Sequence, residues 1–240
     1  MLDFKPERAS INDYATQPLA VCGKSFVADM SGALYWPGEK TVIIADLHLE
    51  KGSAFAARGV MLPPYDTRET LQRLAEVIDR YEPARVIALG DSLHDAEGAA
   101  RIDGDDLAIL NILQEDRQWI WVTGNHDPEI GARLGGSVVD RVVCGGLKLQ
   151  HAPFEGEVTH EIAGHLHPAA KLSVYGHTIR RPCFVGNGRR LVLPAFGAFA
   201  GGLNVLDAAF EPLFGTDGIR VWMLGQEGVY PVATRQLATD

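Results

Sequence analysis

The sequence predicts an α/β protein in which two β-sheets pack face to face with helices outside them. Two observations predict this class. Short apolar runs alternate with amphipathic helical segments over residues 41–122, whereas short strands and glycine-rich turns dominate residues 138–193. Helices early in the chain and hairpins late in it are typical of a sheet-on-sheet sandwich flanked by helices.

Three buried strands are expected in the first half of the chain. Each is a short apolar run rich in β-branched or aromatic residues, and polar loop residues follow it at once. They are Thr41–Ala45, Arg85–Leu89 and Trp119–Val122. Residues 1–40 place proline and glycine between short apolar pieces, which predicts an irregular lead-in with one or two strands.

Two helices are expected between these strands. Thr67–Tyr81 carries apolar side chains at helical spacing, and Asp66 and Glu69 before and within it have the spacing of a capping box. The second helix is expected over Asp105–Asp116, with Asp103 as its cap.

The second half of the chain is predicted to consist of short strands joined by turns. The expected strands are Val138–Val143, Leu147–Gln150, Glu161–Ala163, Lys171–Tyr175, Cys183–Val185 and Leu191–Leu193. The sequence contains no internal repeat and no convincing linker. We therefore expect a single domain over residues 1–240, with its core motifs in residues 41–170.

Charge, hydropathy and cysteine usage bear on several functional classes. The formal net charge of −9 argues against a broad, sequence-independent nucleic-acid surface, which would be basic. Apolar stretches are too short to span a bilayer, and the first residues do not resemble a signal peptide. Three widely spaced cysteines without a C-x-x-C pattern predict reduced thiols in a cytoplasmic protein with no membrane association.

Side chains able to bind metals follow each of the three early strands. Asp46 and His48 follow the first strand, Asp91 follows the second and Asn125 follows the third. Ligands in open α/β sheets collect beyond the carboxyl ends of the strands, so these loops are expected to converge.

Three later histidines complete the set. His151 follows a predicted strand, and the spacing of His165 and His167 places both on one side of an extended segment. Oxygen and imidazole ligands without thiolate suit Mn, Fe, Zn, Co or Ni. A carboxylate able to bridge two cations, here Asp91, is what a two-metal hydrolytic centre requires. The set predicts a two-metal site that hydrolyses a phosphate ester.

These motifs resemble those of the calcineurin-like metallophosphoesterase superfamily. The matching segments are Asp46–His48, Gly90–His94, Gly124–Asp127, His151 and Gly164–His167. The resemblance implies a four-layer α/β/β/α sandwich with a di-metal site at the loops that follow the carboxyl ends of the strands.

The same resemblance implies a role for each site residue. One metal would be held by Asp46, His48, Asp91 and His167, and the other by Asp91, Asn125, His151 and His165. His126 would protonate the leaving oxygen or stabilise the transition state. His94 would contact phosphate or orient His126, with a non-catalytic position as the alternative. Mn is the expected metal, and Fe, Zn, Co or Ni are alternatives.

Three further segments resemble the PdeM family of bacterial phosphoesterases, named as ligase-associated DNA damage response endonucleases. They are Asp46–Gly52, Leu62–Thr67 and Leu193–Leu203. The resemblance implies a phosphodiesterase or endonuclease that acts on DNA in repair, beside an ATP-dependent DNA ligase and a helicase. Two alternatives stay open: a phosphodiesterase or phosphatase of small nucleotides, and a non-catalytic scaffold on the same fold.

Two groups of charged residues are candidates for contact with a substrate. Glu50, Lys51 and Arg58 follow the first metal loop, although solvated surface charge is the simpler interpretation of each. Arg180-Arg181 and Arg189-Arg190 flank a predicted hairpin, where four cations would either hold a nucleic-acid backbone or serve solubility.

Overall fold

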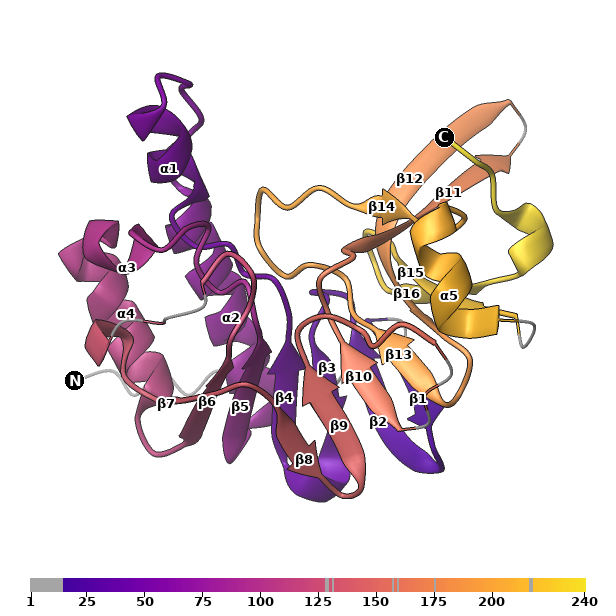
Figure 1. The fold of residues 1–240 in the computed structure, drawn as a ribbon, viewed down its shortest axis with the longest axis horizontal. Helices are drawn as coiled ribbons and strands as arrows, with labels where there is room; N and C mark the ends of the chain where they lie inside the picture. Colours follow the sequence, from indigo (N-terminus) through magenta and orange to yellow (C-terminus); the bar gives the residue numbers. More distant parts are fainter. Residues whose placement is uncertain are drawn as a thin grey trace, which may run out of the picture.

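Two β-sheets stand side by side in the computed structural model, with helices on the outer side of each (Figure 1). The structure describes residues 15–127, 130, 132–156, 158, 160–174, 176–215 and 218–240. Within these ranges, no helix is both long and apolar enough to cross a membrane.

The first sheet contains seven strands in sequence order. They are β1 (Thr16–Val21), β2 (Lys24–Asp29), β3 (Leu34–Trp36), β4 (Thr41–Ile44), β5 (Arg85–Leu89), β6 (Gln118–Val122) and β7 (Ser137–Val139). Strands β1 to β4 pair antiparallel, whereas β4 to β7 pair parallel, so β4, β5 and β6 end at the same edge. The lead-in therefore supplies three strands rather than one or two, because its short apolar pieces pair through tight turns.

The second sheet is built from the later strands. They are β8 (Val142–Cys144), β9 (Leu147–Gln150), β10 (Glu161–Ala163), β11 (Pro168–Val174), β12 (His177–Gly186), β13 (Arg190–Val192), β14 (Leu203–Asn204), β15 (Arg220–Leu224) and β16 (Val229–Val232). Its order is β14-β11-β12-β13-β10-β9-β8, and β15 joins β16 to β12. Strands β9, β10 and β13 run parallel, so their carboxyl ends also share an edge.

Two strand predictions need correction. The single strand expected over Val138–Val143 is wrong, because the chain leaves β7 of the first sheet and enters β8 of the second within this segment. The strands β15 and β16 follow the last strand that the sequence predicted and extend the second sheet. Tyr175, the expected end of one strand, lies outside the described residues.

The helices are α1 (Lys51–Ala57), α2 (Asp66–Tyr81), α3 (Gly98–Arg101), α4 (Gly104–Gln114) and α5 (Glu211–Phe214), with 3₁₀ turns η1 (Pro37–Glu39), η2 (Ala132–Leu134), η3 (Ala208–Phe210) and η5 (Thr234–Gln236). Asp103 caps α4 as predicted, since its side chain accepts a hydrogen bond from the backbone N–H of Asp105. The predicted capping box at α2 is wrong. Its Asp66 carboxylate instead accepts a hydrogen bond from the backbone N–H of Gly52 in α1.

Three apolar clusters separate four layers. The strand β4 shows how the first sheet is buried on both faces: Val42 and Ile44 pack with α2 and α4, whereas Ile43 packs between the two sheets. On the outer face of the second sheet, Val185 and Val221 pack with Phe214 of α5. The predicted four-layer α/β/β/α sandwich is confirmed, while the assignment of residues 1–240 to a single domain stays a prediction.

Candidate metal centre

The candidate centre lies where the carboxyl ends of both sheets' parallel strands meet. Asp46 and His48 follow β4, Asp91 follows β5 and Asn125 follows β6. From the second sheet, His151 follows β9, and His165 and His167 follow β10. The structure brings the side chains of all seven predicted ligands together in two adjacent groups.

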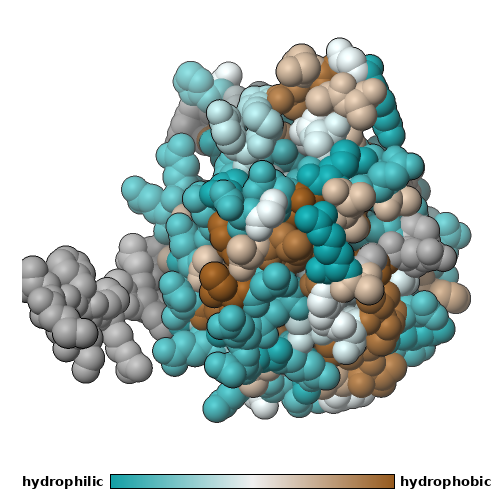
Figure 2. Space-filling view, turned by 90° about the vertical axis from the view of Figure 1, so that its left-hand side faces the viewer, coloured by the Kyte–Doolittle hydropathy of each residue, from teal (hydrophilic) through white to brown (hydrophobic). Residues whose placement is uncertain are grey.

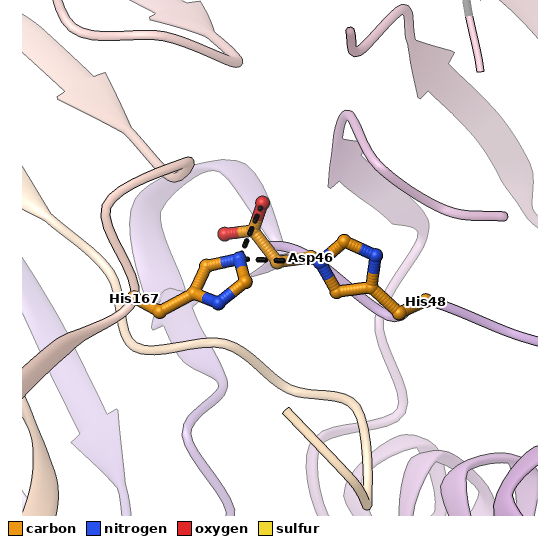
Figure 3. Close-up of side chains that lie close together, drawn as sticks. All are labelled: Asp46, His48 and His167. Carbon is orange, nitrogen blue, oxygen red and sulfur yellow. Dashed lines mark hydrogen bonds and ion pairs between the residues drawn. The ribbon is translucent and has the colours of Figure 1, made fainter. Parts of the chain in front are cut away.

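Asp46, His48 and His167 form the first group (Figure 3). The Nε2 atoms of His48 and His167 are 3.2 Å apart, and Nε2 of His167 lies 3.4 Å from Oδ1 of Asp46. The potential ligand atoms of this group all lie within 4.8 Å of one another. They come from both sheets, so this group exists only because the sheets pack together.

Asp91, His151 and His165 form the second group, and Asn125 adjoins it. Nε2 of His151 lies 2.9 Å from Oδ1 of Asn125, 3.0 Å from Nδ1 of His165 and 3.4 Å from Oδ1 of Asp91. That Asp91 bridges the two groups stays a prediction. Burial lowers the pKa of His48, and the Asp91 carboxylate lies near enough to oppose this effect by raising it.

The hydrogen bonds of His151 test whether this group fits a cation. Its Nδ1 lies 3.0 Å from the carbonyl oxygen of Leu89, which can only accept, so Nδ1 carries the proton. The other ring nitrogen of a neutral His151 then faces the oxygens of Asn125 and Asp91 with a lone pair. Because acceptor atoms converge there, the residues fit a metal ion, with the backbone carbonyl fixing the ring as in known metal sites.

The protonation states of His48 and Asp91 also suit metal ligands. Burial and the neighbouring His167 lower the pKa of His48 to about 3, so its ring is neutral. Burial alone would raise the pKa of Asp91, but its neighbours, among them the backbone N–H of His126, outweigh it and lower the pKa to about 2. Neutral imidazole and ionised carboxylate are the forms that bind cations.

Five of the seven predicted ligands have a left-handed backbone. Their φ angles are 54° at Asp46, 46° at His48, 45° at Asp91, 72° at His165 and 45° at His167. Residues other than glycine rarely adopt positive φ, and such strain clusters at functional sites, at about 1–3 kcal/mol each. The fold therefore contains backbone strain at the positions that direct these side chains toward one place.

Close backbone contacts hold the ligand loops against each other. A side chain at Gly124 would place its Cβ 2.2 Å from the backbone nitrogen of Asp91, and one at Gly197 would place it 2.2 Å from the carbonyl oxygen of Leu47. Only glycine fits either position. The loops after β5 and β6 thus touch directly, and the loop after β13 lies against the one after β4.

His126 lies beside the second group but is held differently from the ligands. Its Nδ1 donates to the carbonyl oxygen of His94 over 2.9 Å, and its backbone N–H donates to Oδ1 of Asp91 over 2.9 Å. The remaining ring nitrogen, Nε2, lies 3.9 Å from Oδ2 of Asp91, and 43% of the side chain is exposed. This nitrogen is therefore open to a substrate at the edge of the centre.

The ring of His94 stacks on that of His126, with centroids 5.6 Å apart and an interplanar angle of 24°. It also lies edge-on to His48, at 5.6 Å. Burial, with the nearby Lys51, lowers the pKa of His94. Among the described residues, its buried Nδ1 has no hydrogen-bond partner. The structure thus places His94 beside the predicted acid rather than among the ligands.

Sequence reasoning assigned no role to Asp127, the last residue of the Gly124–Asp127 motif. This side chain is fully buried, and its carboxylate accepts hydrogen bonds from the backbone N–H groups of Ser92, Leu93 and Gly124. Burial raises the pKa of Asp127 to about 6 despite these bonds. Asp127 ties the loop after β6 to the loop after β5, and its place in the motif was the available signal.

One residue in each of the two charged groups identified from the sequence lies differently from expectation. Glu50 is buried rather than solvated, since its carboxylate accepts hydrogen bonds from the hydroxyls of Ser53 and Thr67. The prediction of a surface with four arginines is wrong, because Arg190 is buried and paired with Glu161 on the neighbouring strand. A charged residue's neighbours across a sheet are not visible in its local sequence.

Solved structures provide the comparison with known proteins. The Pseudomonas putida nuclease MPE superposes with a TM-score of 0.70 at 28% identity, over 90% of this chain and 100% of that one. The Escherichia coli phosphoesterase YfcE aligns at 15% identity over 80% and 98% of the two chains, with a TM-score of 0.39. A protein of unknown function from Aquifex aeolicus, AQ665, aligns at 18% identity over 53% and 78%, with a TM-score of 0.38. No family model and no curated protein matches the sequence.

The fold and the two ligand groups define the class of protein: the chain has the calcineurin-like metallophosphoesterase fold and is a hydrolase of phosphate esters. Within that class, it is similar to the P. putida nuclease over almost the whole length of both chains. The closer resemblance to the PdeM family, the site roles and the metal identity stay predictions.

Proposed function

We propose that this protein is a two-metal phosphodiesterase that cleaves the backbone of DNA. The observation that carries the proposal is the pair of adjacent ligand groups with the open Nε2 of His126 beside them. Similarity to a nuclease over 90% of the chain supports the choice of a nucleic-acid substrate.

The proposed ligands divide between the metals as the family resemblance implies. Asp46, His48, Asp91 and His167 would hold one ion, and Asp91, Asn125, His151 and His165 would hold the other. When bound, the two ions supply a nucleophile from water at neutral pH and stabilise the charge on the phosphoryl oxygens. Mn is the expected metal, and the same oxygen and imidazole ligands accept Fe, Zn, Co or Ni.

His126 acts as the general acid in this proposal. The carbonyl oxygen of His94 accepts a hydrogen bond from Nδ1, which fixes the orientation of the ring. Nε2 then gives its proton to the leaving oxygen of the ester. His94 positions His126 through this carbonyl and the stacked ring. Contact of its own ring with a phosphate oxygen would follow from the family resemblance.

We propose a cellular role in DNA repair for the same activity, in the cytoplasm and beside an ATP-dependent DNA ligase and a helicase. The support is the resemblance of Asp46–Gly52, Leu62–Thr67 and Leu193–Leu203 to the PdeM family. Association with the ligase or helicase is tested by co-purification from a cell in which all three are produced.

The first experiment measures hydrolysis of bis-p-nitrophenyl phosphate and p-nitrophenyl phosphate by metal-stripped protein titrated with Mn²⁺. We expect turnover that requires metal and is faster with the diester, followed by cleavage of DNA oligonucleotides at stated salt. Preference for the monoester would replace the proposal with a small-molecule phosphatase. Absence of turnover with every divalent metal would leave either the non-catalytic scaffold or an enzyme that needs a partner for activity.

A further inference from the structure

The helix α1 presents one face to the candidate centre. Lys51, Phe55 and Arg58 are spaced four and three residues apart, so they share one side of the helix and its last turn. The ring of Phe55 lies 5.6 Å from the ring of His94, which shows that this side faces the centre. In Figure 1, α1 stands above the edge of the first sheet where the ligand loops lie.

Both cations on this face lie near the reactive edge of the centre. Nζ of Lys51 donates to the carbonyl oxygen of Phe199 over 2.9 Å, which leaves two of its three N–H donors for another partner. Arg58 is exposed and forms no ion pair with any residue that the structure describes. Arg58 follows Phe55 by three residues, so it lies on the side of α1 that contacts His94.

A hydrogen-bonded network fixes α1 in this position. The carboxylate of Glu50 accepts from Ser53 and from Thr67 at the start of α2. Arg101 of α3 then donates to the hydroxyl of Ser53 and to Asp95, the residue after His94. The helix is thus tied to the loop that carries His94. Its cations are therefore already in position before a ligand binds.

An apolar surface continues beyond the cations. Val60, Met61 and Tyr65, in the segment between α1 and α2, expose 49%, 84% and 68% of their surface. Figure 2 views the helical side of the molecule and shows apolar residues gathered at its upper end, at the height of α1 in Figure 1. Cations followed by apolar and aromatic side chains match the alternation of phosphate and base along a nucleic-acid strand.

We propose that Lys51, Phe55 and Arg58 of α1 bind the nucleotide next to the scissile phosphate and so select polynucleotides over mononucleotides. Arg58 contacts the flanking phosphate, Lys51 contacts the phosphate nearer the centre, and Phe55 supports the sugar or base between them. The inference rests on the proposed phosphodiesterase function and adds the residues that determine its substrate length. It also explains how a chain of net charge −9 binds a polyanion, through a local group of cations.

The test compares Arg58→Ala with the unaltered protein on a DNA oligonucleotide across a range of salt concentrations. We expect KM to rise about tenfold, as for loss of one charge-assisted contact, with a smaller change in kcat. The dependence of log(kcat/KM) on log salt should become shallower by about 0.7 for a single strand or about 0.9 for a duplex. Arg58→Lys should retain most of the slope, and Arg58→Glu should raise KM further than Arg58→Ala.

Arg235→Ala serves as the matched control, because Arg235 is an exposed arginine in η5 after the last strand of the second sheet. Its KM and salt slope should equal those of the unaltered protein. A KM within twofold and an unchanged slope for Arg58→Ala, with DNA cleavage intact, would overturn this inference alone. If the unaltered protein hydrolysed bis-p-nitrophenyl phosphate but no oligonucleotide, the proposed DNA substrate would fail, and this inference with it.

Discussion

The two sheets contribute different chemistry to the candidate centre. The first sheet supplies both carboxylates and the amide, Asp46, Asp91 and Asn125, together with His48. The second sheet supplies only imidazoles, from His151, His165 and His167. Each three-residue group nevertheless mixes the two sources, so no single sheet contains a whole metal site.

The sheets also orient each other's side chains. The backbone N–H of His165, in the second sheet's loop, donates to the carboxylate of Asp46 in the first. In return, the carbonyl oxygen of Leu89 at the end of β5 accepts from Nδ1 of His151. The centre is therefore a product of sheet packing, and metal binding should stabilise the packed arrangement as any ligand of the native state does.

The strongest test of this comparison is a ligand substitution in each sheet. Asp91→Asn should lose both metals and almost all activity, because the proposed bridging carboxylate serves both ions and amide replacement removes its charge. His167→Gln should lose only the metal of the first group. Loss of a supporting contact alone costs about 10–100-fold in metal affinity, so loss of the shared ligand should cost more than about 100-fold.

Metal content by mass spectrometry after dialysis, with turnover of bis-p-nitrophenyl phosphate, measures both variants. Equal metal content in Asp91→Asn and His167→Gln would contradict a bridging role for Asp91. It would indicate instead that each group binds its ion independently.

The first sheet's loops are expected to carry chemistry beyond metal binding. His126→Ala should lower kcat on DNA by about 10²–10⁴-fold while leaving metal content nearly unchanged. The loss should be smaller with bis-p-nitrophenyl phosphate, because its leaving phenolate needs little protonation. Loss of metal would make His126 a ligand, and an equal loss of rate with both substrates would argue against its role as the acid.

The strands and the proposed ligands could be predicted because both follow local patterns. Buried parallel strands are continuous apolar runs, and Asp46, Asp91 and Asn125 follow such runs directly. Helix α4 could also be predicted, from the spacing of its apolar residues and from its Asp103 cap. The sequence could thus predict which residues approach the centre and which loops carry them.

The remaining features depend on contacts between distant segments. Asp66 has the spacing of a capping residue, yet its carboxylate bonds to the backbone of Gly52 in another helix. Arg190 sits among surface arginines in the sequence but pairs with Glu161 on the neighbouring strand. The positive φ angles at Asp46 and Asp91 are imposed by loop packing, since aspartate does not favour such a backbone enough to predict it.

The smallest expected effect is a loss of stability in the helical layer that leaves metal binding at the centre unchanged. Asp103 accepts from the backbone N–H of Asp105 at the start of α4, which covers the outer face of the first sheet away from the ligand loops. Asp103→Ala should lower the free energy of unfolding by about 1 kcal/mol, whereas Asp103→Asn should retain most of the cap. Urea denaturation of metal-free and Mn²⁺-loaded protein measures both variants.

If the two sheets share the centre as the ligand groups indicate, the loss for Asp103→Ala should be the same with and without Mn²⁺, because the Asp103 side chain bonds to the backbone of α4 and not to a ligand loop. The stabilisation by Mn²⁺ itself, about 2.7 kcal/mol at a hundredfold excess over Kd, should persist in Asp103→Ala and vanish in Asp91→Asn. A cap substitution that also weakened Mn²⁺ stabilisation would show that the helical layer, and not sheet packing alone, sets the geometry of the ligands.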